Sequence, residues 1–258
     1  ALPVDGPAVL NADDPWTNKL RRRIRGPITT FGRSDGADVH LHKVFQTNPP
    51  GTRVHINAGS FSTTIDAPGT AGAVDLAFGA AFALARSLGI SPEDACRGLA
   101  HFHPPSRRMR LTPRPGGGLL LDDTYNANAS SMTVALAALR DAKVPGRRIA
   151  VLGDMFELGE YGPSEHEAVG HKTAFLDRLL CVGSLAQHVA AGARAAGLKE
   201  VDLISADTRC EASITSAVMA AGNWIESEVR HGDAVLLKAS NGMRFAQLTA
   251  KASCNPKT

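Results

Sequence analysis

The spacing of hydrophobic residues divides the chain into two parts. Up to Asp66, short runs of alternating apolar and polar residues are bounded by glycine, proline and asparagine, as in ADVHLHKVFQ, TRVHINA and FSTTID. Such alternation is typical of β-strands with one buried face. We therefore expect the first part of the chain to be rich in β-structure.

Two helices are expected to follow these strands. Small apolar residues recur at helical spacing over residues 71–88, and Gly89 is placed to end that helix. In the next stretch Ser91 is a candidate N-cap, with Pro92 at the first helical position and Asp94 at the third. The second helix should thus begin almost directly after the first.

Strand-like and helix-like segments alternate after Gly118. Five apolar runs are each followed by a segment of helical periodicity, beginning with GLLLDDT and SSMTVALAALRDA. Because parallel strands need crossover connections, this order predicts an α/β fold with a Rossmann-like, doubly wound parallel sheet and helices on both faces. The strands are expected to end along one edge, at Asp123, Asp154, Gly183, Ser205 and Lys238.

A segment rich in proline, arginine and glycine separates the two parts. It spans residues 103–118 and reads HPPSRRMRLTPRPGGG, which is typical of a connection between domains. We place the domain boundary in this segment. A β-rich domain is expected over residues 1–106 and an α/β domain over residues 107–258.

Composition and charge favour a folded protein without a nucleic-acid-binding surface. Of the 258 residues, 43% are hydrophobic and 21% are charged, which suffices for two moderate cores. The net charge is only +3, and lysine and arginine are scattered except in the run KLRRRIR at residues 19–25. We interpret that run as the solvated face of a helix.

The cysteines and the apolar runs favour a cytoplasmic protein. Cys96, Cys181, Cys210 and Cys254 are widely spaced and form no CxxC pair, which favours reduced thiols over disulfides or a zinc site. No run reaches the ~18 apolar residues that a membrane span requires. The first residues also lack the charged-then-apolar order of a signal peptide.

Polar residues gather at the ends of three predicted strands, in the segments DDTYNANASSM, GDMFELGE and KASNGM. Ligands of doubly wound sheets bind at this edge. Taken alone, Asp122 could simply cap a turn and Ser130 a helix. Three such clusters on one edge favour a binding site.

These three segments resemble the C-terminal part of the Mur ligases, and in particular the members that add D-alanyl-D-alanine to UDP-N-acetylmuramoyl-tripeptide. The opening AVLNADDPW is similar to a strand of the family's central ATPase domain. The resemblance implies that residues 1–106 are the C-terminal remnant of that domain and residues 107–258 the family's C-terminal domain. It also implies an ATP-dependent reaction with Mg2+ in the complete enzyme, in which an acyl phosphate is attacked by the amine of the dipeptide.

The resemblance assigns the residues near the start of the second domain to the nucleotide. Arg108 matches an arginine suited to gripping phosphate in two places. The nucleotide-contacting stretch that follows it matches Asp123, Tyr125, Asn126 and Asn128.

The other two clusters are assigned by the resemblance to the incoming dipeptide. Lys238 and Ser240 would face it, with Lys238 pairing with its carboxylate. Asp154, Glu157 and His166 are further candidates on the same side, although a histidine at a helix start also occurs as a structural cap.

Several features of the family have no counterpart in these 258 residues. The uridine-nucleotide domain, the G-x-x-x-x-G-K-[ST] phosphate loop and the family's metal-binding residues are absent. Thr70, Ala71 and Gly72 stand where the family has Arg-His-Asn, and Asn241 stands where it has an arginine. We therefore expect the chain alone to be inactive and not to bind ATP and Mg2+ productively.

Two hypotheses follow for the function. The chain is either the C-terminal portion of an amide ligase, completed by a further N-terminal region or a partner chain, or a pseudo-ligase that serves as a binding or scaffolding module. The intact DDTYNAN and GDMFELGE favour the ligase, whereas the altered nucleotide residues favour the pseudo-ligase. A generic dinucleotide-binding protein is disfavoured because no G-x-G-x-x-G follows a strand.

Overall fold

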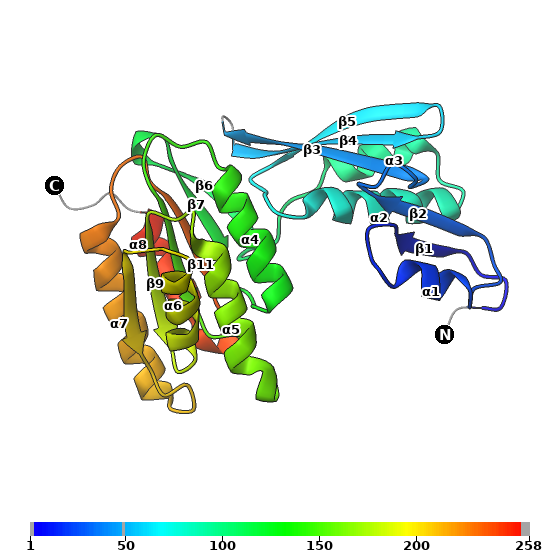
Figure 1. The fold of residues 1–258 in the computed structure, drawn as a ribbon. Coiled ribbons are helices and arrows are strands. Elements are labelled where there is room, and N and C mark those ends of the chain that lie inside the picture. The colour runs from blue at the N-terminus through cyan, green and yellow to red at the C-terminus, as the bar shows by residue number, and fades with distance from the viewer. Residues whose placement is uncertain (1–2, 48–49, 254–258) are drawn as a thin grey trace. The chain divides into compact units, whose positions relative to one another are not determined.

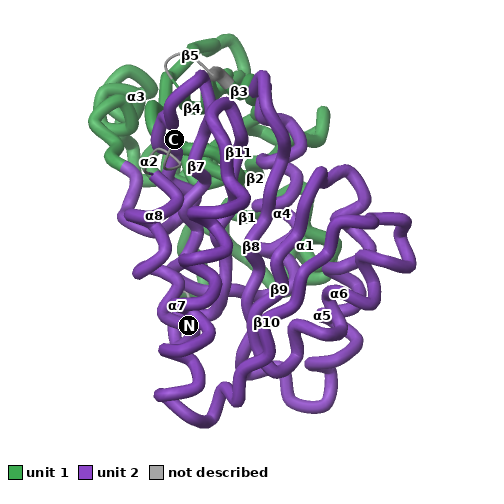
Figure 2. Tube along the Cα trace, turned by 90° about the vertical axis from the view of Figure 1, so that its left-hand side faces the viewer, with its two compact units in different colours: residues 1–103 green, residues 104–258 purple. Residues whose placement is uncertain are grey.

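The chain forms two compact units, residues 1–103 and residues 104–258 (Figure 2). The computed structural model describes residues 3–47 and 50–253. The division falls just before the boundary expected from the sequence, between residues 106 and 107. Cys254 lies outside the described residues.

The first unit contains a five-stranded sheet in the sequential order β1-β2-β3-β4-β5 (Figure 1). The first three strands are parallel, and the pairs β3–β4 and β4–β5 are antiparallel. This agrees with the expected β-rich domain. The strands are β1 (Ala8–Asn11), β2 (Ile28–Gly32), β3 (Val39–Thr47), β4 (Pro50–Ala58) and β5 (Phe61–Pro68).

Three helices accompany this sheet, namely α1 (Thr17–Arg21), α2 (Val74–Ser87) and α3 (Pro92–Ala100). The two longer ones confirm the prediction: Gly89 follows α2 with a φ of +82°, and the Ser91 side chain accepts a hydrogen bond from the Asp94 N–H. The solvated helix face is confirmed only in part. Helix α1 ends at Arg21, so the rest of the basic run lies beyond it.

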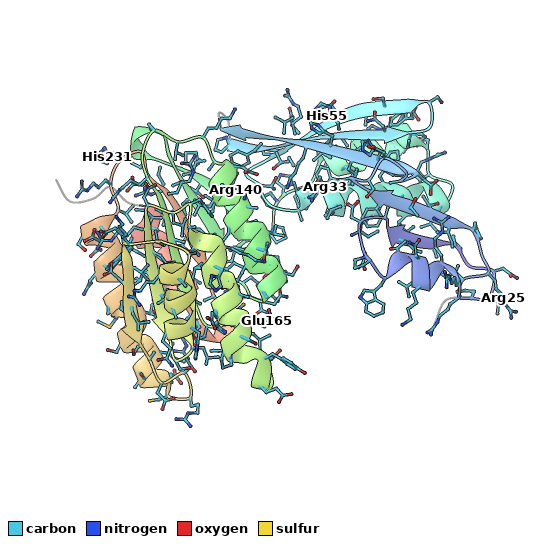
Figure 3. The ribbon with its side chains drawn as sticks, in the orientation of Figure 1. Arg25, Arg33, His55, Arg140, Glu165 and His231 are labelled. Atoms are coloured by element: carbon cyan, nitrogen blue, oxygen red, sulfur yellow. The ribbon has the colours of Figure 1, made fainter. Side chains whose placement is uncertain are left out.

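The core of the first unit lies between the sheet and α2. Phe78 and Phe82 of the helix pack with Val54 and Ile56 of β4, and none of them is more than 1% exposed. At the rim of this core, Arg33 forms a bidentate ion pair with the fully buried Asp75, at 2.6 and 2.9 Å (Figure 3). The pair joins the end of β2 to the first turn of α2.

The second unit contains a six-stranded sheet in the order β10-β9-β8-β11-β7-β6 (Figure 1). The five strands from β7 onward are parallel, as predicted, and their ends coincide with the expected positions to within one residue. They are β7 (Gly118–Asp123), β8 (Arg148–Gly153), β9 (Arg178–Gly183), β10 (Val201–Ser205) and β11 (Ala234–Lys238).

The sixth strand, β6 (Arg110–Arg114), was not predicted and lies in the expected connecting segment. It pairs antiparallel with β7 at the edge of the sheet. Pro113 is tolerated there because an edge strand needs only half of its backbone groups for pairing. The Arg114 side chain is buried and donates to the carbonyls of Arg230 and Asp233 at 3.3 and 3.1 Å.

Helices cover both faces of this sheet (Figure 1). On one face, Ile214 and Val218 of α7 pack with Leu120, Ile149 and Val151 of the strands, all at most 7% exposed. The alternate side chains of the same strands face the other helices. The five helices are α4 (Ala129–Asp141), α5 (Gly162–Gly170) and α6 (Ala186–Ala195) on one face, and α7 (Glu211–Glu228) and α8 (Thr249–Ser253) on the other.

In the described part of the chain, no helix is both long and apolar enough to cross a membrane.

Helices α5 and α6 approach each other closely through two glycines. A Cβ atom on Gly170 would lie 2.2 Å from the Val189 carbonyl oxygen, and one on Gly192 would lie 2.2 Å from the Glu167 carbonyl oxygen. Real Cβ atoms do not come so close to backbone oxygens. The packing of these two helices therefore requires both glycines.

The described cysteines are free thiols. Cys181 lies in β9 and is fully buried, and burial raises the pKa of its thiol to about 12. This thiol is consequently protonated at physiological pH and packs as a small apolar side chain.

Candidate functional site

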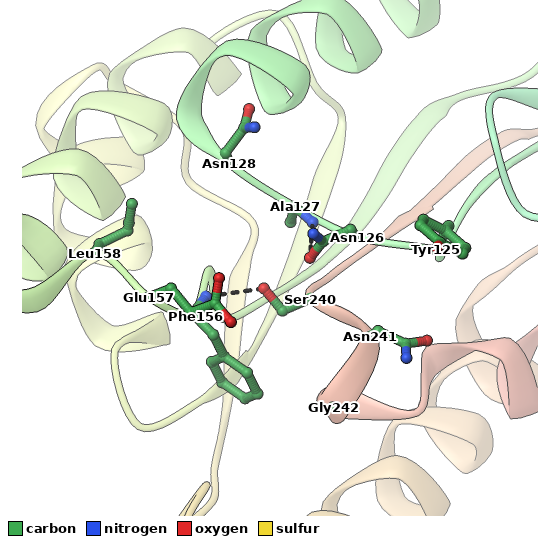
Figure 4. A pocket seen from close by; sticks show the side chains of 10 residues that line it. All are labelled: Tyr125, Asn126, Ala127, Asn128, Phe156, Glu157, Leu158, Ser240, Asn241 and Gly242. Carbon is green, nitrogen blue, oxygen red and sulfur yellow. Dashed lines mark hydrogen bonds between the residues drawn. The ribbon is translucent and has the colours of Figure 1, made fainter.

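A pocket of roughly 450 Å³ opens at the carboxyl edge of the second sheet (Figure 4). Three loops form it, following β7, β8 and β11, and these loops carry the three polar clusters found in the sequence. It is lined by Tyr125, Asn126, Ala127, Asn128, Phe156, Glu157, Leu158, Ser240, Asn241 and Gly242.

The loop after β7 is shaped by side chains that bond to its own backbone. Asn128 caps α4, since its Oδ1 accepts from the Ser131 N–H at 2.8 Å while the Ser131 Oγ accepts from the Asn128 N–H at 3.1 Å. The expectation that Ser130 could cap this helix is therefore wrong. Asn126 Oδ1 accepts from the Ala127 N–H at 2.9 Å, so its amide NH2 remains available to a ligand.

Asp122 forms a turn, which is one of the two roles that the sequence allowed for it. Its Oδ1 accepts from the Thr124 N–H at 3.2 Å and from the Thr124 hydroxyl at 2.7 Å. Its Oδ2 accepts from the Thr249 hydroxyl at 3.2 Å. This carboxylate is 5% exposed and shapes the strand end.

Asp123 and Lys238 are brought together in a buried ion pair. The Lys238 Nζ donates to Asp123 Oδ2 at 2.5 Å and to the Asn126 carbonyl at 2.8 Å, and the Lys238 side chain is 1% exposed. Asp123 Oδ1 also accepts from the Met109 N–H at 3.0 Å. Burial lowers the pKa of Lys238, and the Asp123 carboxylate opposes this effect.

The pair differs from the two roles implied by the resemblance, which gave Asp123 to the nucleotide and Lys238 to the dipeptide. The two residues are direct neighbours in the β7–β11 register. In the structure each charge is met by the other, and the ammonium also holds the backbone at Asn126. The pair thereby positions the loop that forms one wall of the pocket.

Two arginines lie beside Tyr125. The Arg108 guanidinium carbon is 3.8 Å from the centroid of the Tyr125 ring, which is a cation–π contact. The Arg107 guanidinium lies 5.5 Å from the same centroid, and its Nη1 donates to Asn241 Oδ1 at 3.2 Å. Arg107 was not singled out from the sequence, where only its place in the pair Arg107–Arg108 could have drawn attention to it.

The Asp154 carboxylate accepts hydrogen bonds from the backbone of the loop that follows β9. Its carboxylate accepts from the N–H groups of Ser184 and Leu185 at 2.8 and 3.1 Å, directly before α6, and it is 1% exposed. Its carbonyl accepts from the Ser240 N–H at 3.0 Å. Asp154 therefore ties three loops of this edge together.

His166 is fully buried and also supports the loop after β8. Its Nε2 accepts from the Met155 N–H at 2.9 Å, and its Nδ1–H donates to the Gly162 carbonyl at 2.6 Å. These two bonds require the neutral imidazole. Burial lowers the pKa of His166, in agreement with this protonation state.

Stability should therefore depend on pH through His166. Its folded-state pKa lies below the ordinary value near 6.5, so the unfolded chain binds the proton more readily as the pH falls below that value. We expect the free energy of unfolding to drop by at most about 1.4 kcal/mol per pH unit in this window. Urea unfolding between pH 7.5 and 5.5 should show a smaller drop for His166→Asn than for the unchanged chain. An unaltered pH dependence in that variant would contradict this role, and the exposed His231→Asn is the control (Figure 3).

Ser240 and Glu157 present polar groups to the pocket. The Ser240 Oγ accepts from the Phe156 N–H at 2.8 Å, which leaves its hydroxyl proton free to donate (Figure 4). Glu157 is exposed and has a φ of +64°, so a left-handed turn carries its carboxylate beside the pocket. The site thus combines a carboxylate, a hydroxyl and several amides.

In the first unit, residues 70–72, which stand where the resemblance implies Arg-His-Asn, are held by contacts within that unit. The Thr70 hydroxyl donates to the Ala67 carbonyl at 2.7 Å, and the Thr70 carbonyl accepts from the Thr52 hydroxyl at 3.0 Å. The Gly72 carbonyl accepts from the Lys43 ammonium. Thr70 is 3% exposed, so this side chain serves the turn after β5.

The residues that the structure describes do not form a metal centre. Across residues 3–47 and 50–253, no three histidine, cysteine, aspartate or glutamate side chains are grouped so that they could hold a metal ion. The carboxylates of Asp123 and Asp154 are both taken up by protein donors.

Residues 107–241 match the family model described as "Mur ligase, glutamate ligase domain". The UDP-N-acetylmuramoyl-tripeptide–D-alanyl-D-alanine ligase of Mycobacterium bovis is 32% identical over 257 residues, which cover 93% of this chain and 49% of that protein. The Bacillus subtilis ligase of the same name is 28% identical, with 96% and 51% covered. The chain thus spans about half the length of these curated relatives.

Solved structures show the same fold. MurF from Acinetobacter baumannii superimposes with a TM-score of 0.78 at 24% identity, covering 96% of this chain and 52% of that one. MurF from Thermotoga maritima, solved in complex with ADP, has the same TM-score and identity, with 97% and 53% covered.

Proposed function

Because the chain belongs to the Mur ligase family, we propose that it acts in the ADP-forming ligation of D-alanyl-D-alanine to UDP-N-acetylmuramoyl-tripeptide, in cytoplasmic peptidoglycan precursor synthesis. Residues 107–258 would be the C-terminal domain of that ligase, and residues 1–106 would belong to its central ATPase domain. The observation that carries the proposal is the pocket built by the loops after β7, β8 and β11. The names of the similar ligases support it.

The proposed reaction forms one amide bond at the expense of ATP. The tripeptide carboxylate attacks the γ-phosphorus of ATP, giving an acyl phosphate and ADP. The neutral amine of the dipeptide then attacks the acyl carbon, phosphate leaves, and the amine proton passes to the medium. The phosphate loop needed for the first step is not present in these 258 residues, so this chain would contribute binding groups and not the complete phosphoryl-transfer site.

For the nucleotide we propose the edge around Tyr125. The Arg108 guanidinium lies over the Tyr125 ring, and a guanidinium can bind phosphate oxygens in two places. The amide groups of Asn126 and Asn128 line the same pocket and would add polar contacts. The ADP complex of the Thermotoga maritima relative supports an adenine nucleotide as the ligand.

For the dipeptide we propose the opposite wall of the pocket. The Glu157 carboxylate would bind the ammonium group of the resting dipeptide, and the Ser240 hydroxyl would donate a hydrogen bond to an oxygen atom of the dipeptide. The polar groups of four other residues already hold the loops, so these residues would act as positioning residues: Lys238, Asp123, Asp154 and His166.

The pseudo-ligase alternative has no support from the comparisons, because the relatives matched are ligases.

Binding of the dipeptide tests this proposal. D-Alanyl-D-alanine should bind the 258-residue chain weakly, and Glu157→Gln should weaken it about tenfold or more, because one charge-assisted contact is lost. Calorimetric titration at millimolar ligand measures both, with the exposed Glu160→Gln as the matched control. Equal affinity for L-alanyl-L-alanine, or no difference between the two variants, would count against the proposed acceptor site.

The chain alone should not turn over. With ATP, magnesium, UDP-N-acetylmuramoyl-tripeptide and D-alanyl-D-alanine, no phosphate release above background is expected, because no phosphate loop cradles the nucleotide. A coupled phosphate assay measures this directly. Release that Arg108→Ala abolishes would show that these residues suffice for phosphoryl transfer, contrary to this prediction.

A further inference from the structure

Arg107 is held in an uncommon backbone conformation. Its φ is +63°, in the left-handed region, and that of Met109 is +46°. Residues other than glycine adopt such angles where the surroundings hold them. Here the Arg107 carbonyl accepts from the Tyr125 N–H at 3.0 Å, and the Met109 N–H donates to Asp123 Oδ1 at 3.0 Å. The segment is thus fixed to the end of β7.

The Arg107 guanidinium contacts a residue of the pocket lining. The Arg107 Nη1 donates to Oδ1 of Asn241, a residue that lines the pocket. A guanidinium has five N–H donors, and within the described residues this is the one side-chain hydrogen bond that Arg107 makes. Donors of Arg107 therefore remain for a ligand.

The other nearby cations are assigned to different roles. Lys238 is buried against Asp123, and Arg108 lies over the Tyr125 ring, at the edge proposed for the nucleotide. Asn241 must turn its oxygen towards Arg107, because a guanidinium can only donate, so its amide NH2 points elsewhere and can donate as well. Together with the Ser240 hydroxyl, the Arg107–Asn241 pair forms a group of donors suited to a carboxylate.

The pocket also has the opposite charge. Glu157 and Asn241 lie on either side of Ser240 in the close view (Figure 4). A small ligand with an ammonium group at Glu157 and a carboxylate at Asn241 would satisfy both. This describes an amino acid or a short peptide.

We infer that Arg107, held by Asn241, supplies the positive charge that binds the carboxylate of the amino substrate. The inference rests on the proposed function and adds a specificity-determining residue to it. It also gives Asn241 a role as the residue that orients the guanidinium. The carboxylate end of the dipeptide is thereby selected, and a ligand without that group should lose the contact.

The test compares two ligands on matched variants of the 258-residue chain. Arg107→Gln should weaken the binding of D-alanyl-D-alanine about tenfold to a hundredfold, the range expected for one lost charge-assisted hydrogen bond. Its binding of the C-terminal amide of D-alanyl-D-alanine should be unchanged. Arg110→Gln, at an exposed position of β6, should leave both affinities unchanged. Adding Asn241→Arg to Arg107→Gln should restore the affinity for the acid, since position 241 lines the same part of the pocket.

The outcomes separate this inference from the proposed function. Equal binding by Arg107→Gln and Arg110→Gln, or equal losses for the acid and the amide, would overturn the role of Arg107 while dipeptide binding stands. Failure of the unchanged chain to bind the dipeptide would overturn both. Unfolding midpoints of all variants in urea exclude a loss of binding caused by unfolding.

Discussion

Lys238→Ala is expected to lower the free energy of unfolding by about 3–5 kcal/mol, the usual effect of removing one partner of a buried ion pair. The variant leaves the Asp123 carboxylate without its ammonium, in a place where the side chain is only 11% exposed. It also removes the donor to the Asn126 carbonyl. Urea unfolding followed by circular dichroism measures the loss.

Two further variants show whether the charge is responsible. Lys238→Met combined with Asp123→Asn removes both charges and keeps an acceptor for the Met109 N–H, so it should recover a large part of the loss. Lys251→Ala breaks the exposed pair with Glu226 and should cost less than about 1 kcal/mol. If Lys238→Ala were no more harmful than Lys251→Ala, the structural role of the buried pair would be refuted. Loss of ligand binding in Lys238→Ala alone would not identify a substrate contact.

Gly192→Ala is expected to destabilise the second unit by about 3 kcal/mol, the upper part of the range for overpacking. The added methyl group would meet the Glu167 carbonyl oxygen, which cannot move without shifting α5. Gly170→Ala should act in the same way on Val189 of α6. Thermal unfolding measures both effects.

Gly98→Ala is the control for these substitutions. Gly98 lies in α3, and a Cβ atom there has open space within 4 Å. Alanine should stabilise that helix by about 0.5–1 kcal/mol, because it has the higher helix propensity. Tolerance of Gly192→Ala at the level of Gly98→Ala would mean that α5 and α6 are less closely packed than described.

Local patterns predicted much of the fold. The apolar runs of the second unit marked five strands and their ends, because buried parallel strands are apolar along their whole length. The end of α2 at Gly89 and the cap of α3 by Ser91 were also readable, since each depends on a single residue type at a fixed position. The location of the pocket at the carboxyl edge followed from the alternation of strands and helices.

Contacts between distant residues were out of reach. Nothing in the local sequence indicates that Lys238 pairs with Asp123, 115 residues away, and not with a ligand. Strand β6 was hidden by Pro113 and the flanking glycines, which usually mark loops but are tolerated at a sheet edge. Asn128, and not Ser130, caps α4 because the helix begins at Ala129. The expected segment of helical periodicity begins one residue later, at Ser130.

The place of β11 in the sheet has a consequence for how the chain folds. Of the six strands of this sheet, β11 is the last to emerge during synthesis, yet it lies between β7 and β8 and pairs with both. Until it is made, β7 has no parallel neighbour and β8 has one free edge. Contacts so far apart along the chain form slowly, because a long loop must close first. We therefore expect the second unit to complete its folding only after β11 has left the ribosome, and the pocket to form in that same step.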